Sequence, residues 1–180
     1  MALYHLVREN EGGTEVDVVA MTRQQAKILF DMCSAISKRM DPSKKYIRQT
    51  INRVKYDRRD SFIQVLASES AALDGYSSSV YIIDECHNQK DSKLNDVLAS
   101  SQSARENPLS IYITTAGYLL TGFYYVDVRP NLVGVLEGYV ENDSLFGLIY
   151  TLDEKDDFRD PSVWKKAIPN LGVSVFDDYI

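Results

Sequence analysis

The hydrophobic residues of this chain form short runs and helical stripes, and one run is followed at once by a pair of acids. Residues 80–83 read Val-Tyr-Ile-Ile, and Asp84 and Glu85 come directly after them. Four consecutive apolar residues favour a strand that is buried on both faces of a parallel sheet. Ligands bind outside the carboxyl ends of strands in open α/β sheets, so the pattern places both carboxylates where chemistry would occur.

The other hydrophobic patterns predict strands and helices that alternate along the chain. Thr22 and Gln25 have the spacing of a capping box, and the helix that begins there should end before the Asp-Pro pair at residues 41–42. A basic turn is expected to join two strands into a hairpin, at 46–54 and 61–65. The remaining predictions are strands at 15–20, 80–83, 109–114 and 145–152, a loop at 68–79, a helix at 92–104 and a kinked or broken helix at 121–137.

The strand predicted at 109–114 runs into a turn that carries two hydroxyl groups. A strand, helix and strand in succession imply a right-handed crossover, which brings Thr114 and Thr115 beside Asp84 at one sheet edge. Hydroxyl groups there can bond to a phosphate oxygen or to an attacking water. The alternative is a plain exit from a strand into a turn, since Thr is common in strands and the following Gly117 is common in turns.

Two adjacent carboxylates at the end of a buried strand are typical of a Walker B motif. A nucleotide triphosphatase needs one carboxylate beside Mg²⁺ and a second that orients or deprotonates the attacking water. Successive side chains leave a strand in opposite directions, so Asp84 and Glu85 could take these two roles. The alternative is a buried strand that ends in a solvated acidic turn.

Composition is ordinary for a globular protein, with 180 residues, 44% hydrophobic and 26% charged. The apolar stretches are too short to cross a bilayer and the start lacks a signal-peptide layout, so a cytoplasmic location is expected. Cys33 and Cys86 are expected to be reduced and packed, and the two histidines lack the spacing of a zinc site.

The formal net charge is −6, but the segment from Lys38 to Arg59 holds nine basic and two acidic residues. Its Lys44, Lys45 and Arg48 could contact a DNA phosphate backbone or an acidic neighbouring subunit. A solvated face without a partner is the alternative. The acidic residues at 153–157 are interpreted as part of a solvated linker, because such clusters usually remain hydrated.

Four stretches together resemble the ATPase domain of the large terminase subunit of tailed bacteriophages. Residues 24–26, Gln-Gln-Ala, resemble the R-x-Q-A element of that family, and residues 80–87 resemble its I-I-D-E-x-H Walker B motif. Residues 105–117 end in Thr-Thr-Ala-Gly, like the coupling motif. Residues 164–172 resemble W-x-K-A-N-P-N-L-G, with Ile168 in place of Asn.

This resemblance implies an α/β fold of the P-loop NTPase, additional-strand type, with a mostly parallel sheet flanked by helices. It also implies a parent enzyme that hydrolyses ATP with Mg²⁺ to move double-stranded DNA into a procapsid in the host cytoplasm. The small terminase subunit and the portal protein would be its partners. The implied site residues are Asp84 on Mg²⁺, Glu85 as the activator of water, and Thr114, Thr115 and Gly117 in nucleotide sensing and coupling. Arg105, or one of Arg58 and Arg59, could serve as an arginine finger in a neighbouring subunit.

Two departures from the family pattern change what this polypeptide is expected to do. The sequence contains no G-x-x-x-x-G-K-[ST] string, which in the family surrounds the triphosphate with backbone amides. The nuclease domain of the family would be expected to begin only after residue 180. We therefore expect a partial ATPase domain at residues 1–152, incomplete at its N-terminus, and a linker at 153–180. No ATP or Mg²⁺ should bind tightly, turnover should be absent, and an exposed sheet edge could cause self-association.

Two other functions fit the same residues less well. A helicase-type DNA or RNA translocase also uses a D-E-x-H motif, but its coupling motif more often reads S-A-T than T-T-A-G. A non-catalytic assembly or interaction module, derived from such a motor, is the alternative outside the enzyme class.

Overall fold

The computed structural model describes residues 1–67 and 75–176, and it divides the chain into two compact units, Met1–Pro130 and Asn131–Ile180. Residues 68–74 of the predicted loop and 177–180 of the predicted linker lie outside the described residues. The predicted boundary at residue 152 concerns the domains of a parent protein and stays a prediction.

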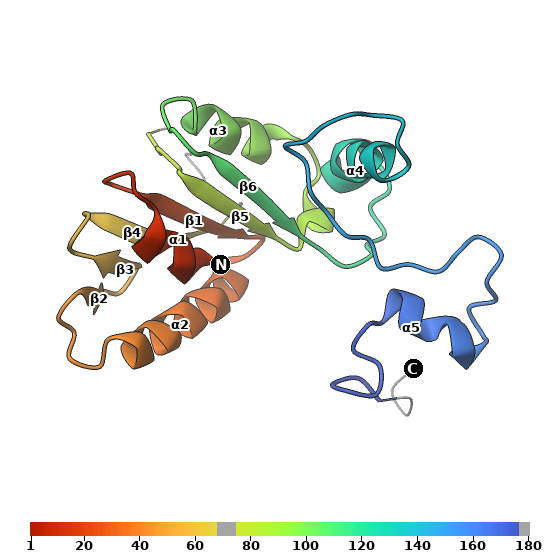
Figure 1. Ribbon diagram of the computed structural model, residues 1–180, viewed down its shortest axis with the longest axis horizontal. Helices are drawn as coiled ribbons and strands as arrows, with labels where there is room; N and C mark the ends of the chain where they lie inside the picture. The colour runs from red at the N-terminus through yellow and green to blue at the C-terminus, as the bar shows by residue number, and fades with distance from the viewer. Residues whose placement is uncertain (68–74, 177–180) are drawn as a thin grey trace. The chain divides into compact units, whose positions relative to one another are not determined.

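The first unit is built on a six-stranded sheet (Figure 1). Its strands lie in the order β2-β3-β4-β1-β5-β6. The strands β4, β1, β5 and β6 are parallel to one another. Strand β3 is antiparallel to both of its neighbours, β2 and β4. Their bounds are β1 Glu15–Ala20, β2 Ile47–Gln49, β3 Arg53–Tyr56, β4 Ser61–Ala67, β5 Val80–Asp84 and β6 Leu109–Ile113.

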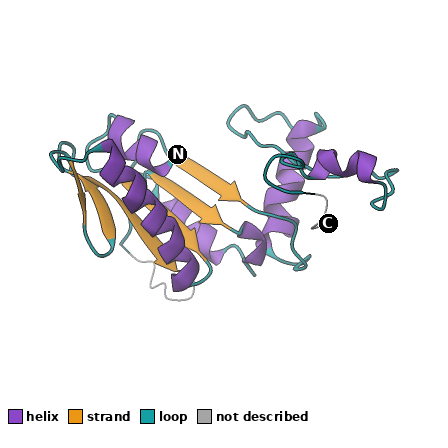
Figure 2. Cartoon of the chain, turned by 90° about the horizontal axis from the view of Figure 1, so that it is seen from below, coloured by secondary structure: helices purple, strands orange, loops and turns teal. Residues whose placement is uncertain are grey.

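Helices cover both faces of this sheet (Figures 1 and 2). α1 (Ala2–Arg8) and α2 (Arg23–Met40) lie on one face, and α3 (Lys93–Ser101) lies on the other. The predicted capping box is present, because the Thr22 side chain accepts from the Gln25 backbone N–H and the Gln25 side chain accepts from the Thr22 N–H. The predicted end of this helix is also confirmed, with Met40 as its last residue and Asp41 as its C-cap.

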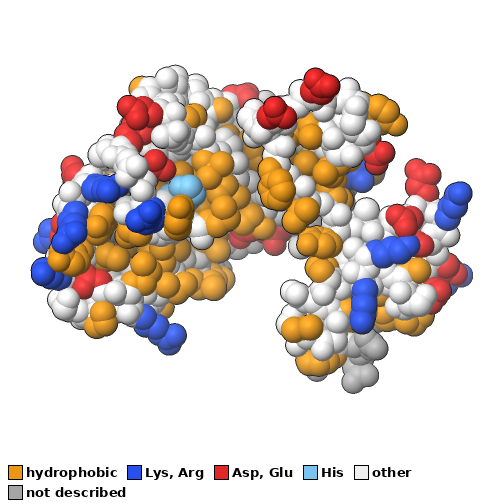
Figure 3. All heavy atoms as spheres, in the orientation of Figure 1, with side chains coloured by type: hydrophobic (Ala, Val, Ile, Leu, Met, Phe, Trp, Pro, Cys, Tyr) orange, Lys and Arg blue, Asp and Glu red, His pale blue; other side chains and the backbone are white. Residues whose placement is uncertain are grey.

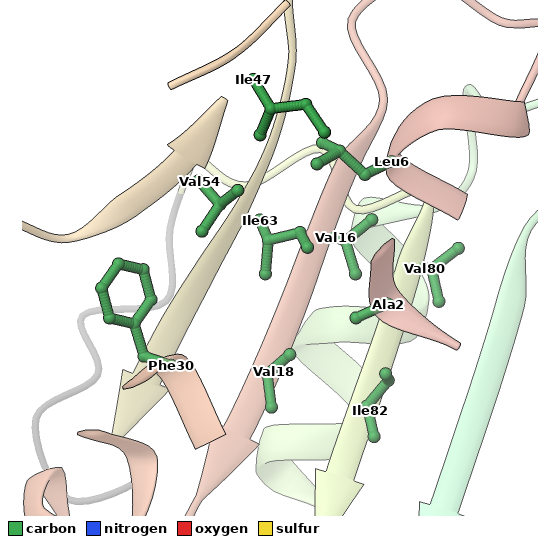
Figure 4. Close-up of a cluster of buried hydrophobic side chains, with 10 residues drawn as sticks. All are labelled: Ala2, Leu6, Val16, Val18, Phe30, Ile47, Val54, Ile63, Val80 and Ile82. Atoms are coloured by element: carbon green, nitrogen blue, oxygen red, sulfur yellow. The ribbon is translucent and has the colours of Figure 1, made fainter. Parts of the chain in front are cut away.

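Alternation along the strands divides the apolar residues into two cores, one on each face. On β5, Val80 and Ile82 pack toward α1 and α2, whereas Tyr81 and Ile83 pack toward α3. Figure 4 shows the first core, in which β-branched side chains predominate; its buried members are Ala2, Leu6, Val16, Val18, Phe30, Ile47, Val54, Ile63, Val80 and Ile82. The second core contains Val19, Tyr81, Ile83, Cys86, Leu94, Leu98 and Phe123. Burial of β5 on both faces is the arrangement that its uninterrupted apolar run predicts.

Two predicted elements are each divided into two pieces. The strand expected at 46–54 splits into β2 and β3, because a tight turn at Thr50 interrupts it: the Thr50 N–H donates to the Arg53 carbonyl over 2.8 Å. The hairpin that this region forms with β4 is confirmed. The helical pattern at 121–137 becomes a π-helical turn at Tyr124–Val128 and then α4 at Arg129–Leu136.

The second unit contains the prediction that is wrong. Residues 145–152 form no strand, although Phe146, Leu148 and Tyr150 alternate outward with relative exposures of 87%, 66% and 58%. A strand needs a neighbour for its backbone hydrogen bonds, and no described residue of this unit supplies one to this segment. Besides α4, the helices among its described residues are short: a 3-10 turn at Pro161–Val163 and α5 at Trp164–Ala167.

The acidic residues of the second unit are partly neutralised by a lysine. Lys166 Nζ lies 2.6 Å from Asp153 Oδ2 and 2.8 Å from Asp156 Oδ2. No cluster of three potential metal-binding side chains occurs within residues 1–67 and 75–176. In the same part of the chain, no helix has both the length and the apolar content that a bilayer crossing requires.

Candidate active site

The chain turns sharply where β5 ends, and this turn separates the two predicted acids. Asp84 is the last residue of the strand, and Glu85 has a φ of 51°, in the left-handed region. A non-glycine residue there costs on the order of 1 kcal/mol, so the surrounding contacts must hold it. Cys86–Asn88 then form a single 3-10 turn. Both acidic side chains are half-buried at the carboxyl end of the strand.

The Thr-Thr turn after β6 lies beside these acids. Asp84 is paired with Ile113 in the parallel ladder, so Thr114 and Thr115 follow at the same edge. The Thr115 hydroxyl lies 3.5 Å from Glu85 Oε2. The structure therefore brings together four of the predicted site residues through the register of β5 and β6, as the crossover argument predicted.

His87 lies between the acid and the turn, and sequence reasoning did not assign it to the site. Its Nδ1 is 3.2 Å from Glu85 Oε2 and 2.8 Å from Thr114 Oγ1. Its backbone N–H also donates to Thr114 Oγ1, over 3.1 Å. The side chain is only 14% exposed. The signal available in the sequence was its place two residues after Glu85, inside the same motif.

Gly117 allows the imidazole of His87 to lie against the turn. A Cβ at this position would come within 2.8 Å of the His87 Cβ and closer still to the ring, which is nearer than real Cβ contacts allow. The Gly117 carbonyl accepts a hydrogen bond of 3.0 Å from the Tyr125 hydroxyl, which fixes the turn from its other side. The glycine is thus required by close packing rather than by its own backbone angles.

Residues 1–129 match the family described as "Terminase large subunit, ATPase domain". The chain belongs to this family. Its six-stranded sheet, flanked by helices, confirms the predicted P-loop NTPase-like fold class. The resemblance inferred from the four sequence stretches is confirmed as well.

The curated relatives of this terminase domain are much longer than the chain described here. Protein YmfN of Escherichia coli (strain K12) is 44% identical over 107 residues, covering 59% of this chain and 23% of that protein. The terminase large subunit of Lactococcus phage p2 is 26% identical over 167 residues, covering 89% of this chain and 30% of its own length. The chain thus spans less than a third of these relatives.

Solved large terminases share the fold. The HK97 bacteriophage large terminase superposes with a TM-score of 0.81 and 21% identity, covering 98% of this chain and 37% of that one. The ATPase domain of the Thermus phage P74-26 large terminase gives a TM-score of 0.51 and 19% identity, covering 65% of this chain and 53% of that one. At these identities the likeness concerns the fold.

Arg105 of this terminase domain lies away from the acids, at the opposite ends of the strands. Its guanidinium donates to Glu11 Oε1 over 3.0 Å and to the Gly13 carbonyl over 3.1 Å, and it also bonds to the Ser77 carbonyl. Gly13 and Ser77 precede β1 and β5, respectively. These contacts would have to break before Arg105 could reach a nucleotide on a neighbouring subunit, so its role as an arginine finger stays a prediction.

A buried carboxylate near the same end of the sheet was not predicted. Asp17, on β1, is fully buried and accepts hydrogen bonds from the Gln64 amide, over 2.8 Å, and from the Ser78 hydroxyl. Burial raises the pKa of Asp17 to about 6. Burial also raises the pKa of Glu15, which shares the Gln64 amide at 2.7 Å.

The predicted basic residues of the terminase domain lie by the strand farthest from β6. Lysine and arginine side chains gather where β2 and β3 lie (Figure 3). Lys44 and Lys45 are exposed, whereas Arg48 forms an ion pair of 2.5 Å with Asp57, and this pairing lowers the pKa of Asp57. The Arg48 charge is therefore partly compensated within the chain.

Proposed function

We propose that this chain contains part of the catalytic site of a phage DNA-packaging motor protein. The whole protein would hydrolyse ATP to translocate double-stranded DNA. The observation that carries this proposal is the position of Asp84 and Glu85 at the sheet edge where the Thr114-Thr115 turn begins, with Glu85 Oε2 3.5 Å from the Thr115 hydroxyl. Membership of the terminase large subunit ATPase family supports it. A large terminase from a thermophilic bacteriophage has been solved in complex with ADP, which supports a nucleotide as ligand.

Asp84 fits the role of a Mg²⁺ ligand. Mg²⁺ sites in nucleotide-hydrolysing enzymes use one or two carboxylates and complete their coordination with water and phosphate oxygens. Asp84, half-buried at the strand end, offers such a hard oxygen ligand. A bound Mg²⁺ would supply neutralisation of the charge on the phosphates.

Glu85 would act on the attacking water. Its backbone turn at φ 51° directs it away from the line of the strand, toward the turn after β6. One carboxylate oxygen is held by the His87 and Thr115 side chains, and the other is left to orient the water and accept its proton. Thr114, Thr115 and Gly117 would transmit the loss of the γ-phosphate to the parts of the motor that grip DNA.

The remaining partners follow from the same family. The whole protein would work in the host cytoplasm with the small terminase subunit and the portal protein. Because the printed sequence lacks a G-x-x-x-x-G-K-[ST] string, this polypeptide alone should bind nucleotide weakly and turn it over poorly.

The test is ATP hydrolysis by the whole natural protein that carries this sequence. Glu85→Gln should lower kcat by about 10²-fold or more while ATP binding is retained, because it removes the base and keeps the side-chain shape. Asp84→Asn should weaken Mg²⁺-dependent nucleotide binding. Glu106→Gln, at an exposed acid before β6, is the matched control and should leave both unchanged. Full turnover by Glu85→Gln would show that this acid is not the base.

A further inference from the structure

We propose that His87 is a positioning residue, which holds one oxygen of the Glu85 carboxylate and links it to the Thr114-Thr115 turn. This inference rests on the proposed function, since it concerns how the same acid is oriented for catalysis. This arrangement links the turn to the acid, because one imidazole nitrogen lies 2.8 Å from Thr114 Oγ1 and 3.2 Å from Glu85 Oε2.

The hydrogen bonds of Thr114 indicate which imidazole nitrogen of His87 carries a hydrogen. The Thr114 hydroxyl donates its single hydrogen to the Thr115 carbonyl, over 2.9 Å. Its oxygen is then an acceptor for both the His87 backbone N–H and the His87 Nδ1. With the Thr114 hydrogen directed to that carbonyl, the imidazole carries a hydrogen on Nδ1. The same nitrogen lies 3.2 Å from Glu85 Oε2, which places the acid directly beside this group.

Packing fixes the ring in this orientation. The His87 side chain is 14% exposed, and the ring lies so close to Gly117 that any side chain at position 117 would overlap it. The His87 backbone is bonded to Thr114 as well, so both its main chain and its side chain follow the turn. A displacement of the turn would thus move the donor that holds Glu85, and the carboxylate would reorient with it.

The role of His87 also accounts for the backbone at Glu85. The left-handed conformation of Glu85 is unfavourable for a residue with a side chain, and it persists only where contacts hold it. His87 Nδ1 and the Thr115 hydroxyl both lie against Oε2 and leave Oε1 for water. His87 therefore selects which oxygen of the carboxylate is free to react.

A kinetic comparison in the whole natural protein tests this role. His87→Leu should lower kcat by roughly 10- to 100-fold, because a misplaced catalytic group costs rate, while KM for ATP changes less than about twofold. His87→Asn places an amide nitrogen near the Nδ1 position and should restore kcat to within about threefold of the parent. An unchanged kcat in the Leu variant, or an Asn variant as slow as the Leu variant, would overturn the proposal.

A spectroscopic comparison in the printed chain separates this proposal from the proposed function, because it needs no turnover. The chain has two histidines, so in the His5→Gln variant every imidazole ¹⁵N signal comes from His87. At about pH 8, where an ordinary imidazole is neutral, Nδ1 should show a protonated and Nε2 an unprotonated ¹⁵N shift. Glu85→Gln should move these signals, and Glu106→Gln should not. The opposite tautomer, or no response to Glu85→Gln, would overturn the contact even if the protein hydrolyses ATP.

Discussion

Arg105 and Glu11 are 94 residues apart in the chain, and their side chains form an ion pair of 3.0 Å. The same guanidinium bonds to the carbonyl oxygens of Gly13 and Ser77. One side chain, 10% exposed, thus joins the segment before β1, the segment before β5 and the turn after α3. These contacts indicate a structural role at the end of the sheet opposite the acids.

Arg105→Ala should destabilise the first unit. Hydrogen bonds to a charged group contribute about 1.5–3 kcal/mol each, and the half-buried Glu11 carboxylate would lose its cation, so a loss of about 3 kcal/mol in the free energy of unfolding is expected. Urea denaturation of the printed chain measures it. Lys90→Ala, at an exposed lysine, is the control and should change the free energy by less than about 0.5 kcal/mol. Unchanged stability, with loss of ATP turnover in the whole protein, would instead support the arginine-finger role.

The stability of the first unit should fall as Asp17 ionises. Its pKa is about 6 in the folded protein, against an ordinary value of 3.8, so the folded state binds the proton more tightly than the unfolded chain. The free energy of unfolding should therefore decrease as pH rises from about 4 to 6, by up to about 3 kcal/mol at 1.4 kcal/mol per pKa unit. Urea denaturation at several pH values measures this slope.

Asp17→Asn should reduce that slope, because an amide does not titrate, and Glu15, whose pKa burial also raises, should account for the slope that remains. Its nitrogen can donate to the Ser78 hydroxyl while its oxygen still accepts from the Gln64 amide. Asp31→Asn changes an exposed acid that pairs with Lys27, and this control should keep the slope. An unchanged slope in the Asp17 variant would assign the titration to another group.

DNA affinity of the whole protein should depend on the exposed lysines more than on Arg48. The variant Lys44→Asn, Lys45→Gln should weaken binding to duplex DNA and reduce the salt dependence, log K against log salt, by about 0.9 for each lost phosphate contact. Asn suits residue 44 because Lys44 has a φ of 54°. Arg48→Gln should have the smaller effect, since Asp57 compensates its charge.

The matched control for DNA binding is Lys165→Gln, at an exposed lysine of the second unit. Fluorescence anisotropy at several salt concentrations provides both the affinity and the slope. If the double variant keeps the parent slope, the basic segment is a solvated surface.

Short sequence patterns, such as a capping box or an apolar run, predicted several helices and strands correctly. The helix at 23–40 began at its capping box and ended where Asp41 turns back, with its carboxylate accepting from the Tyr46 and Ile47 backbone N–H groups over 2.6 and 2.8 Å. The apolar run of β5 predicted burial on both faces. The succession of strand, helix and strand predicted that β6 would lie beside it. These features are determined by a few adjacent residues.

Features that need distant partners could not be predicted in this way. The alternating segment at 145–152 has the composition of a strand, but pairing depends on another strand that its own residues do not specify. The bonds from Gln64 and Ser78 to Asp17 join residues 47 and 61 positions apart. The contact of His87 with Thr114 spans 27 positions and became visible only once the register of β5 and β6 was fixed.

The central position of β1 affects the order in which the unit can assemble during synthesis. β1 pairs with β4 and β5, and both follow it in the chain, at Ser61–Ala67 and Val80–Asp84. A polypeptide leaving the ribosome therefore exposes β1 with at least one edge unsatisfied until β5, at residues 80–84, has emerged. Non-local parallel pairing of this kind is slow, so the innermost strand is the segment of the nascent chain that most needs protection from aggregation.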